Sequence, residues 1–239
     1  MIRCRELSWF LRIIDRRRMR TFLPAPRSAL GLATFGATAG PLVDAVHNQA
    51  LLQYDVLPVS IDALNAHTSL LIPPLLALTY LLLGGVLPRV SELIVGNGRA
   101  LPASSIPLGL TAMLAVTSTV AIIKASELLF SALDSGAGVA LLLLACLAQW
   151  ALLDGAWASL ALALCVAVGG PVAEEPFLYS GCWHYLQPDY FPLGVEQAWS
   201  GLNYITGPCY FAVTTDAIAL GRWLSSINLS DATTNKVEG

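Results

Sequence analysis

Long apolar runs separated by short polar segments make up most of the chain. A helix rises about 1.5 Å per residue, so roughly 20 apolar residues cross the ~30 Å hydrocarbon core of a bilayer. Six runs approach that length, at residues 28–46, 69–87, 106–123, 137–153, 157–172 and 202–224. The pattern predicts an all-α membrane protein that folds as a six-transmembrane helical bundle.

The longest run, Ala137 to Gly170, is interrupted by one charged residue, Asp154. It is too long for one crossing and about right for two, and an ionised aspartate at a helix centre costs roughly 2.5–3.5 kcal/mol. Gly155, directly after it, suits a helix end followed by a tight turn. We therefore expect a helical hairpin, with Asp154 in its turn at the membrane surface.

Prolines and glycines predict where the other spans are irregular. A kink is expected at Pro73-Pro74, near one end of the second span. The sixth span should break at Gly207-Pro208, and a polar loop should begin at Pro171 and run to Ser200. Small residues on the first span, such as Gly31, Gly36 and Gly40, and on the fifth predict close helix packing.

Basic residues indicate the orientation. With six spans and both termini cytosolic, all but Lys124 of the 13 lysines and arginines fall on the cytosolic side. Such an asymmetry follows the positive-inside rule. The sequence thus divides into a basic, partly amphipathic segment at 1–27, a membrane domain at 28–225 and a polar cytosolic tail at 226–239. The Asn228-Leu229-Ser230 sequon should stay without a glycan.

Composition supports this class and narrows the chemistry. The chain is 56 % hydrophobic and 12 % charged, with a mean hydropathy of +0.66, against about 25 % charged residues in soluble domains. The five cysteines and three histidines show no ligand spacing, so no metal or other cofactor is expected. Glu174-Glu175 resembles the paired glutamates of CAAX-type intramembrane proteases but lacks the arginine that follows them. We expect no enzyme and no nucleic-acid partner.

Asp216 and Arg222 in the sixth span leave an alternative open. An ionisable group inside a span is a candidate for function, and a polar path through this span would suit a small transporter or channel. The other interpretation is that Asp216 pairs with Arg222, Thr214 or Thr215 and anchors the helix. The two halves of the chain lack the internal repeat of many secondary transporters.

Three motifs in the second half resemble the Insig (insulin-induced protein) family of six-span membrane proteins. I-K-A-S-E-L (Ile123 to Leu128) is similar to the family's motif at the end of its third span. W-A-L-L-D (Trp150 to Asp154) is similar to the motif that ends its fourth span. P-F-L-Y-S-G-C-W-H-Y-L-Q-P-D-Y (Pro176 to Tyr190) aligns without gaps with a third motif. The resemblance covers about residues 120–225.

The resemblance implies a non-enzymatic sensor of an oxysterol or a diacylglycerol-like lipid. Such a protein retains or regulates sterol-pathway membrane proteins, Scap-like or HMG-CoA reductase-like partners, in the endoplasmic reticulum, or acts at the plasma membrane if it is bacterial. The resemblance is also compatible with a homo-oligomer. Partner contact is implied for Asp154 and Trp150. Lipid contact is implied for Ala137, Leu141, Trp150, Tyr179 and Pro208.

Ala137 and Leu141 mark a departure from the family. They align with the glutamine and threonine that line the family's sterol pocket, and each lost hydrogen bond matters by about 1 kcal/mol. The pocket is therefore expected to accept another lipid. The turn after Asp154 also lacks the family's arginines.

Overall fold

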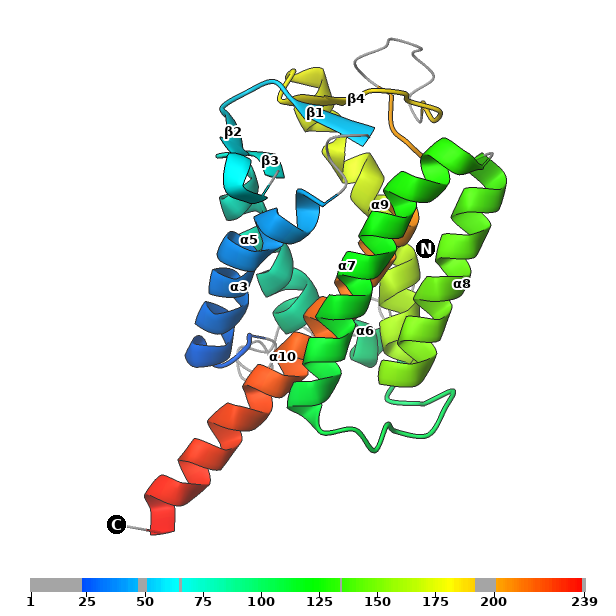
Figure 1. The fold of residues 1–239 in the computed structure, drawn as a ribbon. Coiled ribbons are helices and arrows are strands. Elements are labelled where there is room, and N and C mark those ends of the chain that lie inside the picture. Colours follow the sequence, from blue (N-terminus) through cyan, green and yellow to red (C-terminus); the bar gives the residue numbers. More distant parts are fainter. Residues whose placement is uncertain (1–22, 47–50, 65, 134, 192–200, 238–239) are drawn as a thin grey trace, which may run out of the picture.

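A bundle of long helices, capped at one end by short strands, forms the body of the molecule (Figure 1). The computed structural model of the chain describes residues 23–46, 51–64, 66–133, 135–191 and 201–237. Its helices are α3 (Pro26–Asp44), α5 (Ile72–Leu81), α6 (Leu87–Val95), α7 (Leu108–Ala132), α8 (Ser135–Leu153), α9 (Trp157–Tyr179) and α10 (Thr206–Val237). A π-helical segment, η2 (Leu82–Val86), joins α5 to α6 into one bent rod. Residues 1–22 of the basic segment predicted at 1–27 lie outside the described residues.

Each of the six predicted spans corresponds to a helix or to this rod. Among the described residues, four helices are long and apolar enough to cross a membrane: Ile72–Val95, Leu108–Ala132, Gly136–Leu153 and Trp157–Tyr179. The chain is therefore a multi-pass membrane protein, mostly helical. α3 and α10 occupy the first and last predicted spans but carry more polar residues.

The helical hairpin around Asp154 is confirmed. α8 ends at Leu153 and α9 begins at Trp157, so the apolar run is split as predicted. Gly155 adopts φ +75°, a left-handed conformation that favours glycine at the end of a helix. The Asp154 side chain is only 6 % exposed, however, so the turn holds it inside the protein rather than at a solvated surface.

Three predicted irregularities lie elsewhere. α9 continues through Pro171 and Pro176 to Tyr179, so the predicted start of the loop at Pro171 is wrong; helices in lipid tolerate proline where neighbouring groups satisfy the freed carbonyl. α10 begins at Thr206, which places Pro208 in the first turn, where an N–H has no helical partner anyway. The Pro73-Pro74 pair likewise sits in the first turn of α5, and the rod deviates instead at the π-helical turn with Gly84 and Gly85.

Glycines set the closest helix crossings. A Cβ added to Gly36 of α3 would lie 2.3 Å from the carbonyl oxygen of Leu76 in α5. A Cβ on Gly221 of α10 would lie 2.0 Å from the carbonyl oxygen of Gly84. The predicted small-residue face of the first span is confirmed at Gly36. The second crossing pins the π-helical turn against α10.

The strands lie at the opposite end of the bundle from the Asp154 turn (Figure 1). β1 (Leu52–Tyr54) pairs antiparallel with β4 (Trp183–Tyr185), with Gln53 opposite His184. β2 (Pro58–Ile61) and β3 (Ala66–Ser69) form a second antiparallel pair, joined by the short helix η1 (Asp62–Leu64). The apolar-run pattern contained no signal for these strands.

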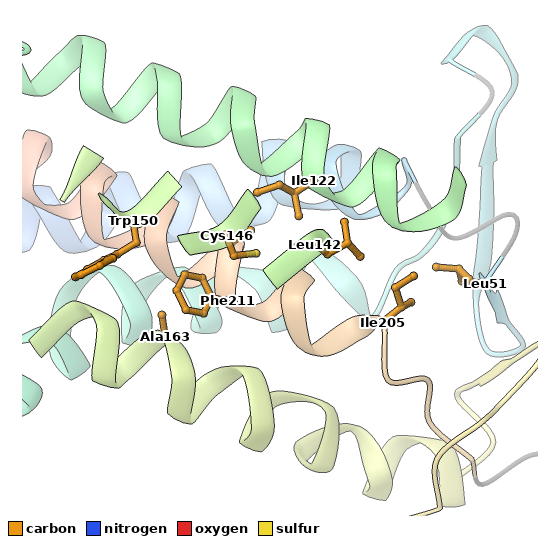
Figure 2. Packing of buried hydrophobic residues seen from close by; sticks show 9 residues of the cluster. Leu51, Ile122, Leu142, Cys146, Trp150, Ala163, Ile205 and Phe211 are labelled. Carbon is orange, nitrogen blue, oxygen red and sulfur yellow. The ribbon is translucent and has the colours of Figure 1, made fainter. Parts of the chain in front are cut away.

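The main core cluster joins α7, α8, α9 and α10. Figure 2 shows Trp150 and Cys146 of α8 beside Phe211 of α10, with Ala163 of α9 below. Phe211 and Cys146 are 0 % exposed. Around Phe211 this side of α10 is filled by side chains. Nearer the Asp154 turn, a second cavity of about 390 Å³ is lined by Thr111 of α7, Leu153 of α8 and Thr215 of α10.

Candidate lipid cavity

A cavity lies on the other side of α10, between α3, α5, α9 and the strands β1 and β4. Its volume is about 340 Å³. Most of its wall is apolar and comes from different helices, including Leu75, Leu76, Leu83, Leu87, Ile123, Val166, Phe177 and Val213. Leu82 in the same wall is 37 % exposed, so the cavity is open to the surroundings of the bundle.

The bent rod explains why this space stays open. α6 packs against α9 and η2 packs against α10, whereas α5 packs mainly against α3. The π-helical turn between them redirects the rod, so α5 leans away from α9 as it runs toward the strands. β1 and β4 close the wide end, where Tyr54, Trp183 and Tyr185 line the cavity.

A polar cluster occupies that end. The Glu174 carboxylate accepts hydrogen bonds from Tyr210 Oη at 2.5 Å, Tyr185 Oη at 2.8 Å and Trp183 Nε1 at 3.3 Å. Asp44, at the last residue of α3, accepts one from Tyr54 Oη at 2.5 Å. All of these side chains line the cavity. The donors come from two strands and α10, so the cluster also ties the strands to the bundle.

The cluster contains acidic side chains and no basic ones among the described residues. Its lining includes Asp44 and Glu174 but no arginine, lysine or histidine among the described residues. Burial raises the pKa of Tyr54 well above its ordinary value, and the Asp44 carboxylate adds to the shift. Burial and Glu174 act in the same way on the pKa of Tyr185. Both phenols therefore stay protonated and act as donors to the carboxylates.

The residues implied in lipid contact by resemblance do not line this cavity. Leu141 is 48 % exposed on the outside of α8, and Ala137 lies one turn before it. Trp150 is in the core and donates from Nε1 to the Ala156 carbonyl at 3.0 Å. Tyr179 ends α9 half-exposed, and the Pro208 carbonyl accepts a bond from Cys146 Sγ at 3.2 Å. Their contact with lipid stays a prediction.

Sequence reasoning missed the polar end of the cavity. Glu174 was interpreted as half of a carboxylate pair in a loop, whereas it lies in α9. The signal that was available is the group of aromatic hydroxyl and indole donors in the Tyr179–Tyr190 region, which needs acceptors when it is buried.

At the opposite end, Asp154 joins the turn to α10. Its Oδ2 lies 2.8 Å from Arg222 Nη1, and its Oδ1 accepts a bond from the Ala156 N–H at 3.1 Å. Arg99 donates to the Asp154 backbone carbonyl. None of the three partners considered for Asp216 pairs with it. Arg222 pairs with Asp154, and the Thr214 and Thr215 hydroxyls donate to backbone carbonyls of α10. Trp150 lies one turn before Asp154 and packs beside Trp157, with 6.3 Å between ring centroids.

Solved structures with a similar fold identify the architecture of this chain. The crystal structure of a mycobacterial Insig homologue, MvINS from Mycobacterium vanbaalenii, aligns with a TM-score of 0.61 and 22 % identity. The alignment covers 84 % of this chain and 95 % of MvINS. The chain has the Insig fold. A cross-linked trimer of MvINS aligns equally well. No family model and no curated protein matches the chain. The Insig fold is thus recovered in three dimensions, as the sequence motifs predicted.

Proposed function

We propose that this protein is a non-enzymatic membrane sensor that binds a neutral lipid with a free hydroxyl group between α3, α5, α9 and α10. The observation that carries the proposal is the cavity itself. Its wall is apolar along three helices and ends in buried hydrogen-bonding groups, which is the usual character of a lipid-binding site.

The polar end selects the headgroup. A carboxylate has about four lone-pair sites, and Glu174 uses three of them on Tyr210, Tyr185 and Trp183. Asp44 accepts only the bond from Tyr54 among the bonds described. The site therefore has spare acceptor positions on two carboxyl groups. It favours a lipid that donates a hydroxyl hydrogen, such as a diacylglycerol or a sterol, and repels a phosphate or a fatty-acid carboxylate.

The cavity also limits how the lipid lies. Its volume of about 340 Å³ is at the lower end for ligand sites, so long acyl chains continue past Leu82 into the surrounding bilayer. Occupancy would hold α5 away from α9. A ligand that binds one helix arrangement better than another shifts the equilibrium toward it and so alters the affinity for a partner.

The remaining parts of the proposal concern topology and partners. We propose six crossings with both termini cytosolic, with the basic Arg99 and Arg222 at the same end as Asp154. The Asp154 turn with Trp150 is the proposed contact for a membrane protein of the Scap-like or HMG-CoA reductase-like kind. The Insig fold occurs in a mycobacterial protein, so it does not by itself favour the endoplasmic reticulum over a plasma membrane. The existence of a MvINS trimer makes a homo-oligomer compatible with the fold.

Lipid analysis of the purified full-length protein tests the proposal. We expect a neutral hydroxyl lipid to co-purify in near-stoichiometric amount and to be identified by mass spectrometry after extraction. Leu83→Trp fills the cavity and should lower the retained lipid about tenfold. Leu144→Trp, on the outside of α8 where the native side chain is 63 % exposed, is the matched control and should retain it.

Glu174→Gln tests the headgroup contact separately. It keeps the shape of the side chain but removes the charge that faces Tyr210 and Tyr185, so retained lipid should fall several-fold while the fold persists. Retention of phospholipid alone by the native protein, or equal lipid content in Leu83→Trp and Leu144→Trp, would contradict the proposal.

A further inference from the structure

Asp216 of α10 is a buried carboxylate that neither the cavity nor the Asp154 turn uses. Its side chain is 0 % exposed, and neither carboxylate oxygen has a hydrogen-bond partner among the described residues. No described cation compensates the charge of an ionised Asp216, since the nearest cation along the helix, Arg222, pairs with Asp154. A carboxylate in this setting needs either a counter-charge or a proton.

The groups around Asp216 are short of hydrogen-bond donors. The Tyr80 hydroxyl of α5 and the Thr119 hydroxyl of α7 lie close to it, but neither makes a hydrogen bond with its oxygens. Gln149 Nε2 of α8 donates to Thr119 Oγ1 at 3.0 Å and to Ser118 Oγ at 2.9 Å. Thr119 Oγ1 in turn donates to the Ala212 carbonyl at 3.0 Å. The donors of Thr119 and Gln149 are therefore already directed away from the carboxylate.

Four oxygens of this cluster remain without a partner: both of Asp216, Oε1 of Gln149 and Oη of Tyr80. Of these, only the Tyr80 hydroxyl carries a hydrogen that it can donate. One further hydrogen would let a second oxygen of the cluster act as a donor and would remove the charge. We propose that Asp216 binds a proton, and that the packed arrangement of α5, α7, α8 and α10 is the protonated state of the protein.

Of the charged groups on the helices packed against α10, Glu175 of α9 also has two buried carboxylate oxygens without a hydrogen-bond partner among the described residues, and it is the second candidate for a bound proton. The following groups are paired. Asp44 of α3 accepts a hydrogen bond from Tyr54, and Glu174 of α9 accepts hydrogen bonds from its three donors. Lys124 of α7 pairs with Glu127. Tyr80 is the titratable side chain beside Asp216. Binding or loss of a proton at Asp216 therefore determines the charge of this cluster.

The proton site adjoins the cavity. Tyr80 lines the cavity wall while its hydroxyl meets Asp216, and the close crossing of Gly84 with Gly221 lies one turn farther along both elements. Loss of the proton would draw water to the carboxylate and loosen α5 from α10, which changes the cavity wall. Lipid binding and proton binding are then linked. This coupling rests on the proposed lipid function, whereas the proton site itself does not.

Thermal unfolding of the full-length protein in detergent, from about pH 5 to pH 9, tests the proton site. The unfolded chain exposes Asp216 and releases the proton, so the native protein should lose stability as the pH rises. Asp216→Asn is permanently neutral and of the same size; it should remove this loss and raise the unfolding temperature at alkaline pH. Asp62→Asn, an exposed aspartate of η1, is the control and should follow the native profile.

Infrared spectroscopy gives a second readout that does not depend on unfolding. At neutral pH the native protein should show the carbonyl stretch of a protonated carboxylic acid, and Asp216→Asn should lose that band. Tyr80→Phe, which removes only the hydroxyl, should keep the band and shift its frequency. This variant also tests the site if Asp216→Asn does not fold.

Three results would overturn the inference. Superimposable pH profiles of the native protein and Asp216→Asn would show that Asp216 carries no linked proton. Absence of the carboxylic-acid band would show that the group is ionised. Stabilisation by Na⁺ but not by choline at equal ionic strength, lost in Asp216→Asn, would replace the proton with a metal cation. For the coupling, lipid retention should fall with rising pH in the native protein and not in Asp216→Asn; equal retention at every pH would refute it.

Discussion

The two sides of α10 differ in how they use the same small and apolar residue types. Toward α7 and α8, the middle of the helix buries Phe211 against Cys146 and Trp150, and these side chains pack together (Figure 2). Toward α3 and α5, the same helix borders the cavity with Tyr210 and Val213. The difference arises from the bent rod, because the π-helical turn directs α5 away from α9.

The comparison teaches that an open cavity requires a rigid opposite wall. A bundle in lipid gains little from the hydrophobic effect between helices, so its shape depends on packing contacts and buried hydrogen bonds. The filled side supplies those contacts. The open side can then keep an apolar cavity without collapse of α5 onto α9.

Phe211→Ala should have the largest effect, because it removes a fully buried ring from the filled side. Large-to-small changes in soluble cores cost roughly 3–5 kcal/mol, and the loss in a membrane protein is smaller because lipid can solvate the unfolded helix; we expect about 2 kcal/mol or more. Unfolding in SDS-titrated micelles measures it. A cost below that of a substitution in the cavity wall would invert the comparison.

Asp154→Ala should have an intermediate effect, because it breaks the ion pair with Arg222 and the bond to the Ala156 N–H. Arg222 is about one-third exposed and can regain water, so we expect roughly 1–2 kcal/mol rather than the larger cost of a fully buried pair. Asp154→Asn keeps the turn hydrogen bond and should recover part of this loss. Equal unfolding of the two variants would show that the turn bond contributes nothing.

The sequence predicted the elements better than the site. Apolar runs and the Asp154-Gly155 pair were sufficient for the helices and the hairpin, because the thickness of a bilayer fixes helix length and a charge marks the turn. The strands were missed because β1 is three residues long and pairs with β4, far away in sequence. No local period reports such a contact.

The cavity could not be predicted because it depends on the directions of helices. A proline is visible in a sequence, but the π-helical turn at Gly84-Gly85 follows from the tertiary crossing with Gly221. The polar end similarly combines Asp44 and Tyr54, which are ten residues apart, with Glu174 of α9, far away in sequence. The positions implied by the resemblance lie on α8, at the end of α9 and in the first turn of α10, and none of them lines this cavity.

Leu75→Ala should have the smallest effect, because Leu75 lies in the cavity wall and is already partly exposed. Its truncation enlarges an existing space instead of creating one in a packed core, so we expect a cost below about 1 kcal/mol in lipid-free detergent. With lipid bound, the same truncation removes contacts to the ligand, and stability should drop further by the lost part of the binding free energy. Unfolding measured before and after lipid removal separates the two terms. If the cost is the same in both states, the wall at Leu75 does not contact a lipid, and the open side of α10 differs from the filled side in packing alone.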